Sequence, residues 1–207
     1  PRFWGAWSVL AVLTLLAITL SGERAALLTG LLGLGTAAAL LMITERTWRK
    51  PLLAASASVV AMMVVLVLTN AWVHTRALQL LDKVNDFSHS DYGIIFTAAW
   101  RVGKENLLHG VGIHGFRDAA PLLDYYGAPF HSMHPHHAYL EWFAETGAPG
   151  LLLFLALIAV LVRSGMQLYR KAPTRASRAA AALAVGAVAQ HFFPLVGMQS
   201  FFINWSA

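Results

Sequence analysis

The sequence predicts an all-α polytopic membrane protein with about five transmembrane helices and a helical loop between the third and the fourth. The 207 residues are 57% hydrophobic and 12% charged, with a mean hydropathy of +0.59, which excludes an ordinary water-soluble domain. The apolar residues form uninterrupted blocks rather than periodic stripes. The basic residues cluster at the ends of these blocks, not in a patch with interleaved aromatic residues, so no nucleic-acid partner is expected.

Five blocks qualify as spanning helices: residues 3–20, 25–44, 51–72, about 148–162 and about 179–196. A helix of about 18 to 22 residues covers about 27 to 33 Å, the thickness of a hydrocarbon core. The fourth block is short, and extending it back through Tyr139 and Trp142 gives it an aromatic entry zone.

The connections predict the orientation. The links 45–50 and 163–178 are rich in Arg and Lys, so we expect both in the cytoplasm, with the N-terminus inside and residues 73–147 outside. The chain then divides into three transmembrane helices (1–72), an external loop that carries the expected active site (73–147), and two transmembrane helices joined by a basic cytoplasmic loop (148–207). Because the sequence begins at Pro1 without a methionine, we expect a fragment of a longer protein.

The external loop is predicted to be structured. Apolar residues of 73–84 share one helical face, and those of 92–102 repeat the pattern, which indicates two amphipathic helices. The stretch HGVGIHGF then supplies Gly110, Gly112 and Gly115. This stretch follows a predicted helix rather than a strand, so we interpret it as a turn that shapes a pocket rather than as a nucleotide loop.

The most distinctive motif is HSMHPHH, residues 131–137, which holds four histidines. An imidazole titrates near neutrality, so one of them can act as a general base. The same histidines, completed by Glu141 or Glu145, can form a zinc site, although Pro135 interrupts any single-helix presentation and the spacing matches no standard ligand pattern. The third interpretation is a solvated interfacial loop without a catalytic role.

Three arginines of the loop are candidates for binding phosphate through forked hydrogen bonds: Arg76, Arg101 and Arg117. Arg76 lies just after a span and is the weakest candidate. Arg101 and Arg117 flank the glycine-rich stretch, which favours them. For any one of them alone, a solvated arginine is the competing interpretation.

Three pieces of the sequence together resemble the O-antigen ligase family: YGIIFTAAW, NLLHGVGIHGFR and HPHHAYLEWFAETGAPGLLLF. The family pattern reads as a helix, then P-L-x-G-x-G-x-x-x-F, then H-P-H-N-x-Y-L-E-x-x-A-E-x-G-x-x-G. The close resemblance covers about residues 90–155, and its last motif is the specific one.

The resemblance implies a GT-C-like glycosyltransferase of the bacterial inner membrane, with the loop 73–147 in the periplasm. Such an enzyme transfers a glycan from undecaprenyl diphosphate to an acceptor hydroxyl, commonly on lipid A core, with inversion and without a metal or cofactor. It also implies His136 as the base and arginines, here Arg101 or Arg117, as the diphosphate contacts. His134, His137, Glu141 and Tyr92 are expected to support the site. For Glu141, the interpretation that it orients the base or joins a polar network competes with the more common case of a rim carboxylate without a partner.

Two departures from the family pattern concern the site. His137 replaces the family asparagine, and Tyr92 or Gly93 stands where many members carry an arginine. The competing hypothesis is a histidine-rich metal-binding or transport protein. Transport is disfavoured because the predicted spans hold almost no ionisable residues, His191 excepted.

Overall fold

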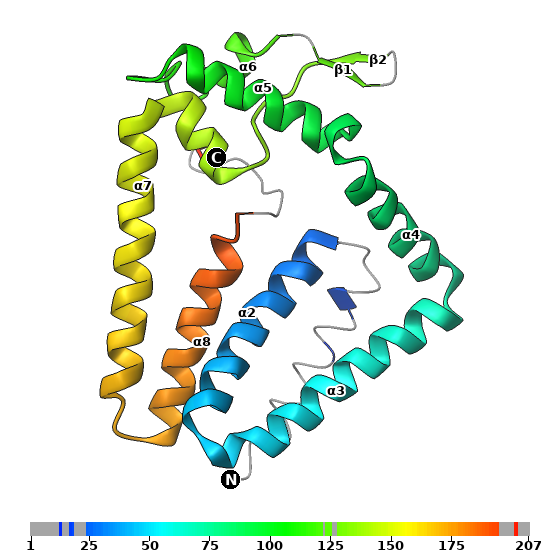
Figure 1. Ribbon diagram of the computed structural model, residues 1–207, viewed down its shortest axis with the longest axis vertical. Coiled ribbons are helices and arrows are strands. Elements are labelled where there is room, and N and C mark those ends of the chain that lie inside the picture. The colour runs from blue at the N-terminus through cyan, green and yellow to red at the C-terminus, as the bar shows by residue number, and fades with distance from the viewer. Residues whose placement is uncertain are drawn as a thin grey trace. The chain divides into compact units, whose positions relative to one another are not determined.

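The computed structural model describes residues 13, 17–18, 24–121, 123–125, 128–194 and 201–202 (Figure 1). The predicted first span, 3–20, lies almost entirely outside these residues. The elements in chain order are α2 (Arg24–Thr44), α3 (Arg46–Thr69), α4 (Ala71–Asn85), the 3-10 helix η1 (Phe87–His89), α5 (Asp91–Glu105), α6 (Phe116–Ala119), β1 (Leu123–Tyr125), β2 (Ala128–Phe130), α7 (Ala138–Lys171) and α8 (Arg175–His191).

The predicted all-α membrane architecture is confirmed. Three helices of the described residues are long and apolar enough to cross a membrane: Ala26–Thr44, Arg46–Thr69 and Ala138–Lys171. They correspond to the second, third and fourth predicted spans. The fifth predicted span, about 179–196, overlaps α8, which begins earlier, at Arg175, and ends at His191, before the predicted limit. His191, expected in mid-span, is therefore the exposed last residue of this helix.

Several predicted boundaries shift for identifiable reasons. The link 45–50, expected to be a loop, is helical from Arg46 onward. Helix α3 ends at Thr69 because the Asn70 side chain caps the next helix, accepting hydrogen bonds from the backbone N–H groups of Trp72 and Val73 at 3.1 Å each. The expected amphipathic helix of 73–84 is α4. A short antiparallel sheet that we did not predict pairs Leu123 with Phe130 and Tyr125 with Ala128.

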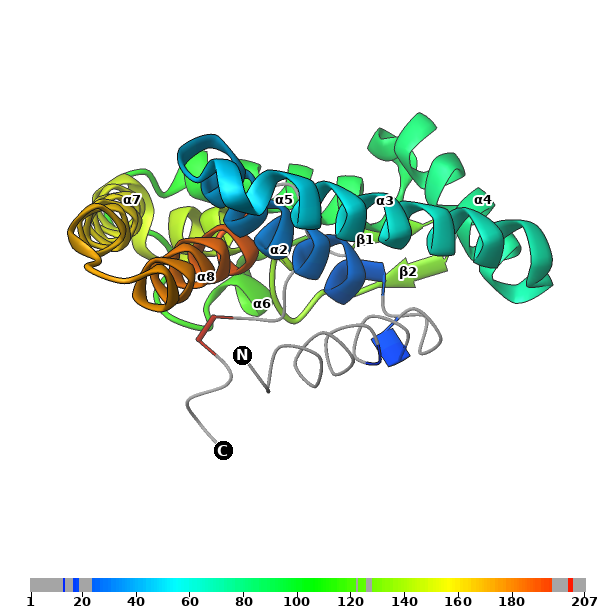
Figure 2. The same ribbon diagram turned by 90° about the horizontal axis from the view of Figure 1, so that it is seen from below.

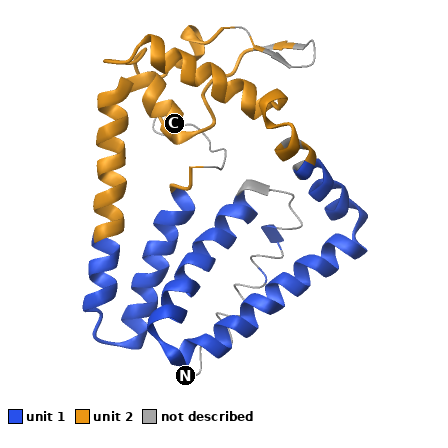
Figure 3. Ribbon diagram, viewed as in Figure 1, with its two compact units in different colours: residues 1–81, 164–191 blue, residues 82–163, 192–207 orange. Residues whose placement is uncertain are grey.

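The chain forms two compact units (Figure 3). Unit 1 comprises residues 1–81 and 164–191, and unit 2 comprises residues 82–163 and 192–207. In unit 1, α2 packs along α8, as Figures 1 and 2 show. The crossing requires small residues, since a Cβ on Gly33 would lie 2.9 Å from the Gly186 carbonyl oxygen. Tyr169, Ala182 and Leu41 belong to the buried cluster of this unit.

Unit 2 holds the predicted loop chemistry. Its core is built from one face of α5, Phe116 of α6, Leu123 of β1 and Ala144 of α7. Helix α5 covers the predicted amphipathic helix of 92–102 and begins at Asp91, because the Ser90 hydroxyl accepts a hydrogen bond from the Gly93 N–H at 3.1 Å. The glycine-rich stretch is a turn, also as predicted, with φ of +64° at Gly110 and +88° at Gly112.

Candidate functional site

The histidine motif directly precedes the first turn of α7. Pro135 is fully buried, and His136 has a φ of +54°, a left-handed conformation that is uncommon for a residue with a side chain. Such backbone conformations persist only where the surrounding structure enforces them, and they occur most often at functional sites. Helix α7 then begins at Ala138, with the Glu141 N–H donating to the His137 carbonyl at 2.9 Å.

His137 has a structural task that fixes its protonation. Its Nδ1 accepts a hydrogen bond from the Leu140 N–H at 3.3 Å, so the proton of the neutral ring belongs on Nε2. Nε2 lies 2.5 Å from the Pro194 carbonyl oxygen and donates to it. Burial also lowers the pKa of His137, which keeps the ring neutral. An asparagine side chain can also accept a hydrogen bond at a helix start and donate one to a carbonyl, so both residue types are suited to these two hydrogen bonds.

The rings of the motif meet the first turns of α5. Tyr92 contacts His136 edge-on at a centroid distance of 5.9 Å, and Phe96 contacts His137 at 4.8 Å. The ring centroids of His134 and His136 lie 3.9 Å apart. The structure therefore brings together four of the predicted site residues, which we call the histidine cluster: Tyr92, His134, His136 and His137.

The ring nitrogens of His134 are desolvated. Both of its ring nitrogens are buried and lack a hydrogen-bond partner within the described residues. Burial, together with the neighbouring His136, lowers the pKa of His134 to about 4. At neutral pH this ring is uncharged, so the cluster does not hold two adjacent positive charges.

The structure distinguishes the two positions at which the family arginine is missing. Gly93 is buried, and a Cβ there would collide with the Phe87 carbonyl oxygen. Position 93 therefore accepts no side chain in this backbone. Tyr92, by contrast, directs its ring to His136.

Glu141 and Glu145 are buried, with 1% and 2% of their surfaces exposed. The expected alternative of a rim carboxylate without a partner is therefore wrong for Glu141, which accepts a hydrogen bond from the Phe201 N–H at 2.7 Å. Glu145 accepts one from the His114 N–H at 2.8 Å. The two carboxylates lie one helical turn apart on the buried face of α7, and each binds the backbone of a segment distant in sequence.

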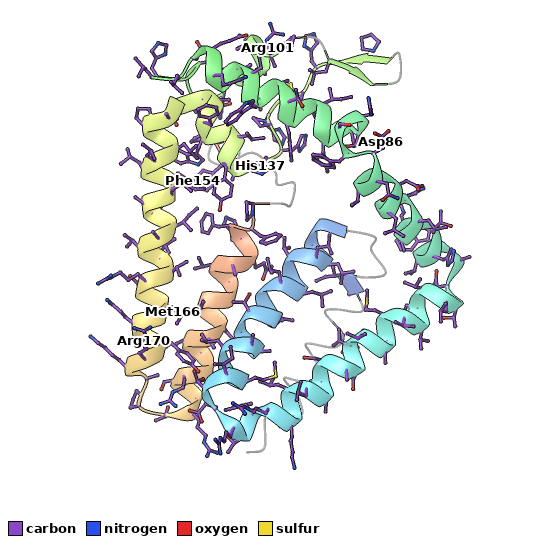
Figure 4. All side chains as sticks on the ribbon, viewed as in Figure 1. Asp86, Arg101, His137, Phe154, Met166 and Arg170 are labelled. Atoms are coloured by element: carbon purple, nitrogen blue, oxygen red, sulfur yellow. The ribbon has the colours of Figure 1, made fainter. Side chains whose placement is uncertain are left out.

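Arg101 and Arg117 are both exposed, and their recorded ion pairs are local. Arg101 Nε donates to Glu105 Oε1 at 2.8 Å, four residues along α5, and 70% of its side chain is exposed. Arg117 Nε lies 3.6 Å from Asp118 Oδ2. In the view of Figure 4, Arg101 lies above the α5 ribbon and His137 below it. Their assignment as diphosphate contacts stays a prediction.

Sequence reasoning missed His114. Its φ of +63° makes it, with His136, one of two non-glycine residues with a positive φ in the described part of the chain. Its Nε2 is buried without a hydrogen-bond partner there, and Glu145 holds its backbone. The available signal was its place inside the glycine-rich turn, where left-handed conformations concentrate.

No group of three or more histidine, aspartate or glutamate side chains is arranged to hold a metal ion among the residues that the structure describes. The rings of the histidine cluster instead contact aromatic residues and one another.

The fold and this cluster define a class: a polytopic helical membrane protein with histidines at the entry to a spanning helix. The sequence model of the O-antigen ligase family matches residues 9–155, more than half of the chain. The chain belongs to the O-antigen ligase family, and is therefore related to enzymes that transfer a glycan from a lipid-linked donor to an acceptor. No curated protein and no solved structure matches it.

Proposed function

We propose that this protein transfers a glycan from undecaprenyl diphosphate to an acceptor hydroxyl at the periplasmic face of the inner membrane, with His136 as the general base. The observation that carries the proposal is the left-handed His136, whose ring lies between Tyr92 and His134 at the first turn of α7. Lipid A core is the acceptor that family membership favours most.

His136 is the member of the cluster best suited to take a proton. His137 is committed to the Leu140 N–H and the Pro194 carbonyl, so its Nδ1 is not available to a substrate. Both nitrogens of His134 are buried. His136 is half-buried, so its ring can meet a substrate and still be held in place by its neighbours.

The proposed reaction needs two groups. The base accepts the proton of the acceptor hydroxyl as its oxygen bonds to the anomeric carbon, and the bond from that carbon to the diphosphate oxygen breaks. The electron pair leaves on undecaprenyl diphosphate, whose growing charge a cation stabilises. In-line attack inverts the anomeric centre and uses no metal. Arg101 and Arg117 are the candidates for the cation, and substrate binding would have to replace the local ion pair of Arg101.

The test is glycan transfer by the full-length protein in cells that lack their own ligase, read from the glycan-bearing acceptor on a gel. His136→Ala is expected to lower the rate by about 10²-fold to 10⁴-fold, the contribution typical of a general base. Arg101→Ala and Arg117→Ala are expected to lower it by about tenfold to a hundredfold, as for loss of a charged hydrogen bond of ~1.5–3 kcal/mol.

The controls are His131→Ala and Arg76→Ala. His131 is an exposed residue of the same motif, and Arg76 lies over the Trp72 ring at 5.3 Å. Both should transfer glycan at the parental rate, with all variants present at equal amounts in the membrane. Parental transfer by His136→Ala would refute the base assignment. A uniform tenfold loss in the control variants as well would show that the assay reports folding rather than catalysis.

A further inference from the structure

An exposed apolar patch lies on unit 2 after the end of α5. Leu107, Leu108 and Ile113 expose 50%, 76% and 63% of their surfaces, although the same turn also holds polar residues that can face water. Trp100, half-exposed on the last turns of α5, lies seven residues before Leu107 in the sequence. We call these four residues the apolar patch: Trp100, Leu107, Leu108 and Ile113.

The backbone of the apolar patch is attached to the point where the span of α7 begins. The Ala148 N–H donates to the Leu107 carbonyl oxygen at 2.7 Å. Gly147 allows this approach, since a Cβ there would lie 2.7 Å from that oxygen and 2.8 Å from the carbonyl carbon of Leu108. The first turn after Ala148 already exposes Leu152 and Leu153 at 65% and 72%, as expected for a lipid-facing surface.

The residues beside the patch are those of a membrane interface. Tryptophan is enriched at the level of the lipid headgroups, where its ring is apolar and its N–H is solvated. The Lys104 ammonium lies over the Trp100 ring at 6.0 Å, and a lysine can keep its charged end in the headgroup region while its stem lies along apolar surface. An apolar patch that lies beside a lysine and next to the start of a span is suited to lipid rather than to water.

We propose that the apolar patch inserts into the lipid interface beside the entry of α7 and anchors the glycine-rich turn to the bilayer surface. The occupant of the patch is the membrane itself. The anchor would hold the turn 110–115, which is attached to α7 through Glu145 and His114, at a fixed depth. This inference does not depend on which reaction the histidine cluster catalyses.

The test uses the absence of cysteine from the sequence, so that a single introduced thiol is the unique labelling site within it. Leu108→Cys and Ile113→Cys are labelled with a polarity-sensitive nitrobenzoxadiazole dye, and the protein is reconstituted into phosphatidylcholine nanodiscs with and without doxyl-labelled lipid. Asp118→Cys, whose native side chain is 80% exposed and charged, is the matched control in the same unit.

We expect blue-shifted emission and quenching by doxyl lipid at positions 108 and 113, and quenching by aqueous iodide alone at position 118. Emission at both apolar positions equal to that at position 118 would overturn the proposal. Shielding from iodide without doxyl quenching, at one protein per disc, would also overturn it, because the patch would then be covered by protein. Shielding that appears only when each disc holds two proteins would assign the patch to a second copy of the chain instead.

Discussion

Glu141 and Glu145 place two carboxylates inside unit 2, where each one satisfies the backbone of a remote segment. Glu145 binds the N–H of His114, and the surrounding ladder continues from the Val111 N–H to the Ala144 carbonyl and from the Gly112 N–H to the Glu145 carbonyl, both at 2.9 Å. A buried donor left without an acceptor costs about 1–3 kcal/mol. These carboxylates therefore hold the glycine-rich turn and the Phe201 segment against the helix that follows the histidine cluster.

The buried histidines give the protein a defined dependence of stability on pH. The folded state keeps His134 neutral down to about pH 4, whereas the unfolded chain protonates it near its ordinary value of about 6.5. Above that value both states are neutral and the full stability is present. As the pH falls from about 6.5 towards 4, only the unfolded state gains the proton, so stability is lost. The lowered pKa of His137 acts in the same direction.

We therefore predict that the apparent melting temperature of the purified protein falls as the pH is lowered from about 7 to about 4.5, and that His134→Gln reduces this fall. The measurement is thermal unfolding in detergent at a series of pH values. His131→Gln, at an exposed position of the same motif, serves as the control and should follow the parental curve. An identical fall in His134→Gln and the parent would mean that His134 is not buried as a neutral ring.

At the scale of the element, α7 is two helices joined at Gly147. This residue has φ +72° and ψ −172°, a region that is essentially restricted to glycine. The break separates the first turns, which carry Glu141 and Glu145, from the spanning part that begins at Ala148. This change of direction lets the helical segment before Gly147 pack against α5. There the ring centroids of Phe143 and Trp100 lie 5.1 Å apart.

Alanine at position 147 should be strongly destabilising, because its Cβ would meet the Leu107 carbonyl oxygen at 2.7 Å in addition to the backbone strain of about 1–3 kcal/mol. Gly112→Ala isolates the strain, since its φ is +88° but no atom lies within 4 Å of the added Cβ. Gly30→Ala in α2, with open space and helical backbone, should change little. The expected order of melting temperatures, from highest to lowest, is Gly30→Ala, Gly112→Ala and Gly147→Ala. Equal values for the last two would show that the contact with Leu107 is not formed.

Some of these elements could be predicted from the sequence because their signals are local. The length and hydropathy of the apolar blocks predict α2, α3 and the span of α7, and the apolar face of 92–102 predicts α5. The buried state of Glu141 and Glu145 could not be predicted, since their partners are backbone N–H groups of Phe201 and His114, far away in sequence. Their spacing of four residues predicts that both lie on one helical face. It does not predict which segments of the chain that face contacts.

The candidate site shows the same division between local and distant information. Pro135 and the four histidines identified the motif, and the family pattern singled out His136. The contact of Tyr92 with His136 depends on how α5 packs against the start of α7, which no local pattern encodes. The ion pairs of Arg101 with Glu105 and of Arg117 with Asp118, by contrast, join residues four and one positions apart, so they belong to the local information.

At the scale of the whole molecule, unit 1 brings the two basic links to the same end of its helices. Arg178, on the first turn of α8, forms an ion pair with Glu45 between α2 and α3, and it also donates to the Ala172 carbonyl at 3.2 Å. Nearby, Tyr169 is hydrogen-bonded to Thr44. Glu45 and Arg178, which belong to the two basic links, are therefore adjacent in unit 1, which agrees with the expectation that both links share the cytoplasmic side.

This arrangement yields the last prediction, the orientation of the chain. Thr47→Cys and Ala176→Cys lie at exposed positions of the two basic links, and Asp118→Cys lies in the predicted periplasmic loop. A membrane-impermeant maleimide applied to cells with a permeable outer membrane should label position 118 at once, and positions 47 and 176 only after the inner membrane is opened. Labelling of positions 47 and 176 but not 118 in intact inner membranes would show that the chain has the opposite orientation. If 47 and 176 differed from each other, the ion pair between Arg178 and Glu45 could not form, and the packing of α2 on α8 would be wrong with it.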